Sequence, residues 1–212
     1  VNSTALPLTN VLPEALGRQV MSRLANLGVD WRCGRDVIGV DPAESDWRVV
    51  LSEGETVQAD LVLSAVGLEA ETALARSAGL HTGRGITVDR YLATADPCIH
   101  ALGDCAEVEG LWLPYVLPLM QQARSLAATL AGQHTAMNLP ALPVVVKTPA
   151  CPLVTCPPPA GAQGTWQARR DTPDGAEYAF TDEGGRELGF ALAGDACGLR
   201  RQWAARMPDL LA

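Results

Sequence analysis

Basic residues are scarce in this sequence of 212 residues, and lysine is almost absent. The chain has 16 Lys+Arg against 24 Asp+Glu, which gives a formal net charge of −8, and Lys147 is its single lysine. A protein that binds nucleic acid needs a basic face for the phosphates. We therefore expect no nucleic-acid partner.

Long apolar runs are also missing from the sequence. No run approaches the roughly 18 residues that a transmembrane helix needs. The first ten residues, VNSTALPLTN, lack the charged region and the apolar stretch of a signal peptide. The mean hydropathy of +0.09 is typical of a globular protein. These patterns predict a cytoplasmic protein with no membrane partner.

Closely spaced metal ligands are absent as well. The six cysteines form no C-x-x-C pair, and the three histidines stand apart from them. A zinc site needs such short spacings, and a hydrolytic triad needs a histidine beside a nucleophile. We interpret the cysteines as reduced thiols, so we expect neither a metal nor a disulfide and assign no catalytic residue.

What the sequence does contain is an alternation of strand and helix patterns up to about residue 135, which predicts an α/β fold. Apolar residues at helical spacing, each followed by a glycine, predict three helices, and short apolar or alternating runs predict the strands. The expected helices are 13–27, 71–79 and 118–131, and the expected strands are 29–34, a hairpin in 47–58, a buried strand at 61–66, and 85–90.

A change of composition near residue 136 predicts a boundary. Residues 137–164 hold 7 of the 15 prolines, so they cannot form a long helix. We expect one strand at 144–147 and a proline-rich connection after it. Beyond these residues we expect strands at 165–170, 176–180 and 187–194 and a helix from about residue 199. The segment 136–212 is therefore predicted to be a small α+β domain.

The stretch CIHALGDCAE, residues 98–107, suggests a ligand site. Its apolar start predicts a buried strand that ends at Gly103 and Asp104. Ligands of doubly wound sheets collect at the carboxyl ends of strands, and glycine allows a close approach of the backbone. The plainer interpretation is a Gly-Asp turn with no ligand.

The helix expected from Pro118 suggests a second part of the same site. Proline is favourable at the first helical position, but Val116 and Leu117 offer no side-chain oxygen to cap the free N–H groups. These donors could bind a ligand that carries negative charge, because a helix N-terminus is electropositive. They could equally be capped by water or by a loop carbonyl.

Together these motifs carry a resemblance to a known family. ADLVLSAVG, GITVDRYLATADPCIHALGDCAE and PLMQQA resemble the FAD-dependent pyridine nucleotide oxidoreductases. VVVKTPACPLV and LGFALAGDA are similar to the rubredoxin reductases within them. The resemblance implies that FAD and NAD(P)H are the cofactors. It also implies that the flavin is bound by Gly103, Asp104, the amides of Leu119 and Met120, and Lys147.

Lys147 also has a plainer interpretation. In the family the ammonium would lie beside the flavin and favour its reduced, anionic form. A lysine within the apolar run VVVKTP could instead lie on an edge strand, where its charge discourages aggregation. The sequence leaves the two open.

The chain differs from the family in its motifs and its length. Family members carry two G-x-G-x-x-G turns, one for FAD and one for NAD(P)H, and this chain has neither. Family members are also nearly twice as long. We therefore expect the N-terminal half to be missing. The expected fold is a partial two-dinucleotide-binding-domain fold. It would comprise the end of the NAD(P)-binding domain (1–66), the last segment of the FAD-binding domain (67–135) and the α+β domain (136–212).

The resemblance predicts an enzyme that passes electrons from NAD(P)H through FAD to rubredoxin or a similar small acidic electron carrier. The arginines of the C-terminal domain would form the docking face; these are Arg169, Arg170, Arg200 and Arg201. The 212 residues alone are expected to be inactive. Two alternatives stay open: a non-catalytic interaction module, which could pair with a separate N-terminal half, and a ferredoxin- or nitrite-reductase-type flavoprotein.

Overall fold

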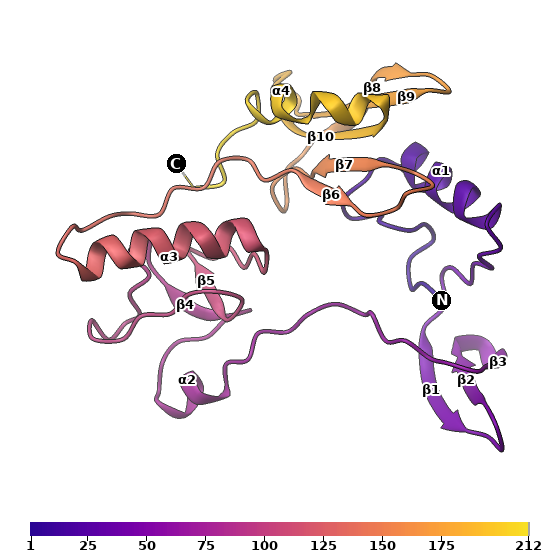
Figure 1. Ribbon diagram of the computed structural model, residues 1–212, viewed down its shortest axis with the longest axis horizontal. Helices are drawn as coiled ribbons and strands as arrows, with labels where there is room; N and C mark the ends of the chain where they lie inside the picture. The colour runs from indigo at the N-terminus through magenta and orange to yellow at the C-terminus, as the bar shows by residue number, and fades with distance from the viewer. Residues whose placement is uncertain (212) are drawn as a thin grey trace. The chain divides into compact units, whose positions relative to one another are not determined.

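The computed structural model describes residues 1–211, which fold into two compact units (Figure 1). The first unit consists of residues 1–64 and 141–208. The second consists of residues 65–140 and the last residues from Asp209. The chain therefore leaves the first unit and later returns to it. Each unit has its own core and is described separately.

The first unit begins with α1 (Glu14–Ala25), within two residues of the predicted helix at each end. Leu16 and Val20 lie on its buried face and pack into one cluster with residues of the C-terminal domain. The predicted strand at 29–34 is wrong, because only Cys33 makes an isolated bridge, to Asn2.

An antiparallel sheet of three strands follows: β1 (Val37–Pro42), β2 (Trp47–Leu51) and β3 (Thr56–Ala59). The predicted hairpin is confirmed, since the short helix η1 (Ser52–Gly54) turns β2 into β3. Strand β1 was not predicted from the sequence, because Gly39 and Pro42 break its apolar pattern.

The predicted buried strand at 61–66 is wrong. This segment forms no strand, and Leu61 is 80% exposed and Val66 96% exposed. A strand exists only where a neighbour satisfies its backbone N–H and C=O groups. Within residues 1–211 no strand pairs with this segment, so its apolar composition alone does not make it a strand.

The C-terminal part of the first unit is an antiparallel sheet of five strands in the order β6-β7-β10-β9-β8. The strands are β6 (Val144–Val146), β7 (Leu153–Cys156), β8 (Thr165–Asp171), β9 (Gly175–Thr181) and β10 (Glu187–Gly194). Four of these match the prediction. Strand β7 was missed because it lies between Pro152 and Pro157 in a segment interpreted as a connection.

Both faces of this sheet are covered. On one face α1 packs against Leu153, Tyr178 and Ala191. On the other, Phe190 and Leu192 pack beneath Trp203. Trp203 belongs to α4 (Arg200–Ala204), which follows η2 (Asp195–Leu199). The expected α+β domain therefore includes the helix at the start of the chain in its core. The division into segments 1–66, 67–135 and 136–212 stays a prediction.

The second unit carries α2 (Ala73–Ser77), the parallel strands β4 (Ile86–Val88) and β5 (Ala106–Val108), and α3 (Val116–Leu130). Its core includes Leu92, Leu126 and Met137. The predicted helices at 71–79 and 118–131 and the strand at 85–90 are confirmed. In the part of the chain that the structure describes, no helix has the length and hydropathy to cross a membrane.

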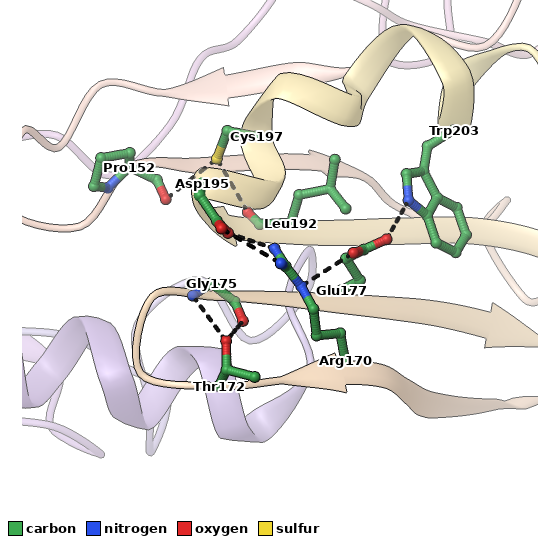
Figure 2. Close-up of polar contacts among 9 residues, drawn as sticks. All are labelled: Pro152, Arg170, Thr172, Gly175, Glu177, Leu192, Asp195, Cys197 and Trp203. Carbon is green, nitrogen blue, oxygen red and sulfur yellow. Dashed lines mark hydrogen bonds and ion pairs between the residues drawn. The ribbon is translucent and has the colours of Figure 1, made fainter.

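The segment that carries α4 is fixed to the sheet by a polar cluster (Figure 2). Arg170 forms ion pairs with Asp195 and with Glu177, whose Oε2 accepts the indole N–H of Trp203 at 3.1 Å. Gly175 lies beside this cluster. A Cβ atom there would overlap Oδ1 of Asp195 and come within 2.9 Å of the Ala193 carbonyl oxygen.

We predict that Gly175→Ala lowers the free energy of unfolding by about 2–4 kcal/mol, because the methyl group forces the ion pair apart. Urea denaturation measures the loss. The matched control is Gly198→Ala, because a Cβ atom there meets nothing within 4 Å. Equal stability of Gly175→Ala and the control would contradict the packing described.

Candidate functional site

The turn at Gly103 lies in front of β5 rather than at the end of a strand. Residues 98–102 form no strand, and His100 makes only an isolated bridge to Ala93. The segment is held in a loop instead: Asp96 accepts the Cys98 N–H at 2.9 Å, and the Thr94 N–H donates to the Ile99 carbonyl at 3.0 Å. The prediction of a strand ending at Gly103 is therefore wrong, but a turn is present.

Gly103 holds the turn against α3. Its φ of +86° lies in the left-handed region that favours glycine. Its N–H donates to Oε1 of Gln122 at 2.5 Å, and Gln122 is only 3% exposed. A Cβ atom on Gly103 would lie 3.0 Å from Cδ1 of Leu119. Glycine therefore lets the backbone approach the first two turns of this helix.

Asp104 follows with an exposed side chain. Its carbonyl oxygen accepts the indole N–H of Trp112 at 2.8 Å. Among residues 1–211 its carboxylate has no hydrogen-bond or ion-pair partner. The carboxylate is thus available to accept a hydrogen bond from a ligand hydroxyl.

Helix α3 starts two residues earlier than predicted, at Val116, so Pro118 occupies its third position. The predicted lack of a side-chain cap is confirmed. The Leu119 N–H already donates to the Tyr115 carbonyl at 3.2 Å, so the free donors at this end are the amides of Val116 and Leu117. Contact of Leu119 and Met120 with a flavin stays a prediction.

Lys147 follows β6, which is an edge strand of the five-stranded sheet. Its side chain is exposed and borders a groove of about 310 Å³ with Val145, Pro149 and Arg200. This position agrees with the interpretation of an edge-strand lysine. Lys147 belongs to the first unit and the Gly103 turn to the second, and its contact with a flavin stays a prediction.

The four arginines proposed as a docking face differ in their contacts. Arg169 pairs with Glu187 at 3.3 Å, and Arg170 lies in the polar cluster of Figure 2. In the described part of the chain, Arg200 and Arg201 form no ion pair, and both are exposed. These two keep their charge available for a partner.

Burial disfavours the reactive thiolate form of the three cysteines in the C-terminal domain. Burial raises the pKa of Cys156 to about 11 and also raises the pKa values of Cys151 and Cys197. A protonated thiol is a weak nucleophile. This supports the interpretation of these cysteines as spectators.

The polar groups of Asp104 and of the start of α3 fit the isoalloxazine ring and ribityl chain of a flavin nucleotide. A free carboxylate suits a ribityl hydroxyl, and two unpaired amides at a helix N-terminus suit the edge of the ring that becomes anionic on reduction. Val116, 73% exposed, adds apolar surface beside the amides. The fit covers the ring and the ribityl chain only. The sequence lacks the glycine-rich turns that would bind the diphosphate.

Sequence reasoning missed Gln122 and Trp112. Both side chains hold the backbone of the turn, one at Gly103 and the other at Asp104. A signal for Gln122 was present: a glutamine stands on the same helical face as the buried Leu126. A polar group in such a position needs a partner.

Two family models match the chain. The model described as "Pyridine nucleotide-disulphide oxidoreductase" matches residues 1–129, and the one described as "Rubredoxin binding C-terminal domain" matches residues 136–207.

Similar curated proteins are about twice as long as this chain. Rubredoxin-NAD(+) reductase of Alcanivorax borkumensis is 42% identical over 207 residues, which are 97% of this chain and 53% of the relative. Nitric oxide reductase FlRd-NAD(+) reductase of Aeromonas hydrophila is 40% identical over 190 residues, 89% of this chain and 49% of the relative. The chain thus spans about half the length of the relatives it matches.

Solved structures share the fold. A ferredoxin reductase from Rhodopseudomonas palustris has a TM-score of 0.84 at 23% identity, over 98% of this chain and 53% of its own. An FAD-dependent pyridine nucleotide-disulphide oxidoreductase from Desulfovibrio vulgaris has a TM-score of 0.82 at 23% identity, over 96% and 56%. The expected partial two-dinucleotide-binding-domain fold with a small α+β domain is confirmed.

We predict that Asp104→Ala weakens FAD binding by about tenfold, the loss expected for one charge-assisted hydrogen bond. Quenching of flavin fluorescence on titration measures the affinity. Glu44→Gln removes an exposed carboxylate from the turn between β1 and β2 and serves as the control. An affinity that falls equally in both variants would argue against a contact at Asp104.

Proposed function

The chain belongs to the pyridine nucleotide-disulphide oxidoreductase family, and on that premise we propose that it is part of an FAD-dependent NAD(P)H oxidoreductase. The enzyme passes electrons to rubredoxin or a similar small acidic iron protein. The observation that carries the proposal is the Gly103 turn held against α3: Asp104 in this turn has a free carboxylate, and the helix has two free amides at its N-terminus.

The residues of this chain bind and orient the cofactor. When bound, FAD would supply the coupling of a two-electron donor, NAD(P)H, to two one-electron acceptors. Asp104 would accept a hydrogen bond from the ribityl chain. The amides of Val116 and Leu117 would donate to the ring edge that becomes negatively charged on reduction.

The C-terminal domain is proposed to bind the protein that accepts the electrons. Its match to a rubredoxin-binding model supports this role, and the free charges of Arg200 and Arg201 suit an acidic partner. By name, the relatives include a Rubredoxin-NAD(+) reductase and a Nitric oxide reductase FlRd-NAD(+) reductase, so rates measured with different acceptors would identify the acceptor of this protein. A cytoplasmic location belongs to the same proposal and agrees with six free thiols.

The chain alone is expected to bind FAD weakly and NADH not at all, since it lacks both glycine-rich turns. The experiment that tests the function joins it to the first half of the Alcanivorax borkumensis reductase. We expect a yellow protein that is bleached by NADH and reduces rubredoxin, and an Asp104→Ala variant that binds flavin about tenfold more weakly. A folded but colourless chimera would contradict the proposal and favour an interaction module.

We predict that Arg200→Glu with Arg201→Glu slows rubredoxin reduction by the chimera about tenfold at low salt, because charge reversal repels an acidic partner. The difference should shrink as salt screens the charges. Stopped-flow absorbance of rubredoxin measures the rate. Arg18→Glu with Arg48→Glu makes the same change of net charge elsewhere and is the control. An equal slowing in the control would contradict a docking face at Arg200 and Arg201.

A further inference from the structure

We propose that Gln122 is a positioning residue, which sets the place of the Asp104 carboxylate by holding the backbone of the preceding residue. The inference rests on the proposed function and deepens it. Gln122 touches Gly103 and acts on the cofactor only through the turn. Trp112 binds the same turn through a second hydrogen bond, to the Asp104 carbonyl.

The hydrogen bond between Gln122 and Gly103 is buried. The Gln122 side chain is buried on the inner face of α3, and its Oε1 accepts the Gly103 N–H at 2.5 Å. Removing a buried acceptor leaves the N–H without a partner, which costs more than the bond itself contributes. The turn is therefore tied to the helix by a bond that water does not readily replace.

The conformation of Gly103 supports the same close approach. Its φ of +86° is left-handed, and a Cβ atom there would lie 3.0 Å from Cδ1 of Leu119. Glycine therefore leaves room for the turn beside α3, and the hydrogen bond to Gln122 limits how far the turn can move away.

Trp112 holds the other side of Asp104. Its indole N–H donates to the Asp104 carbonyl at 2.8 Å, and the guanidinium of Arg84 lies 4.7 Å from the centre of its ring. The Gly103 N–H and the Asp104 carbonyl are the outer polar groups of this dipeptide, and each is bound by a side chain. The backbone at the base of the Asp104 side chain is therefore fixed.

This geometry explains why a free carboxylate can be a precise ligand. In the described residues nothing binds the Asp104 side chain itself, so a fixed backbone limits the carboxylate to the places that its rotamers can reach. A preorganised backbone reduces the entropy lost when a ligand binds. Gln122 and Trp112 provide that order through contacts with the backbone alone, and the carboxylate stays free.

The first test needs no cofactor. The rate of hydrogen exchange at the Gly103 amide is measured by ¹⁵N NMR in the 212-residue protein without FAD. Gln122→Met removes the acceptor at similar volume and should speed exchange at least about tenfold, a factor that corresponds to about 1.4 kcal/mol. Gln122→Glu keeps an oxygen at the same reach and should restore protection. Gln121→Met, at the neighbouring position, is the control and should leave it unchanged.

The second test is FAD titration of the same variants. Gln122→Met should lower the affinity about tenfold, whereas Gln121→Met should not. If Gln122→Met fails to fold, Gln122→Asn replaces it, because it keeps the amide but is one methylene too short.

The outcomes separate the two claims. Unchanged protection of Gly103 in Gln122→Met, or faster exchange with undiminished FAD affinity, would overturn the positioning role. If the wild-type protein and its chimera bind no flavin while the exchange result holds, the proposed function fails and the tether remains only a structural contact.

Discussion

The hydrogen bond from the Gly103 N–H to the buried side chain of Gln122 is the interaction on which the candidate site depends. It brings a sharp turn with a left-handed glycine against the start of α3. Without it, Asp104 and the amides of Val116 and Leu117 would be separate features of a loop and a helix. With it, the turn that bears the acceptor packs on the helix that bears the two donors, and a flavin edge with its ribityl chain requires an acceptor and donors of these kinds.

The first unit follows a different constraint, the need to cover both faces of a five-stranded sheet. Helix α1 comes from the start of the chain and covers one face, while the segment with Trp203 covers the other. The sheet therefore depends on residues more than 100 positions apart, and the hydroxyl of Thr155 donates to the carbonyl of Val11 at 2.5 Å within this contact. The polar cluster around Arg170 then fixes the segment that bears Arg200 and Arg201.

Much of the fold could be predicted from the sequence, because periodicity and glycine stops report local structure. Helix α3 and strands β8, β9 and β10 were found in this way. The errors have physical causes: the run from Leu61 to Val66 has the composition of a buried strand, but a strand also needs a partner, and β7 was hidden by its flanking prolines. At the site, Gly103 and Asp104 carry a recognisable motif. Gln122 could not be assigned a role, since its partner lies 19 residues away and only the fold brings them together.

The central claim is that Asp104 and the first amides of α3 face one flavin. The most direct measurement is a ¹⁵N NMR titration of the protein with FAD, followed at the amides of Asp104, Val116 and Leu117. The account predicts that the three resonances shift together and give a single dissociation constant. Shifts confined to other residues, or different dissociation constants for the turn and the helix, would contradict it.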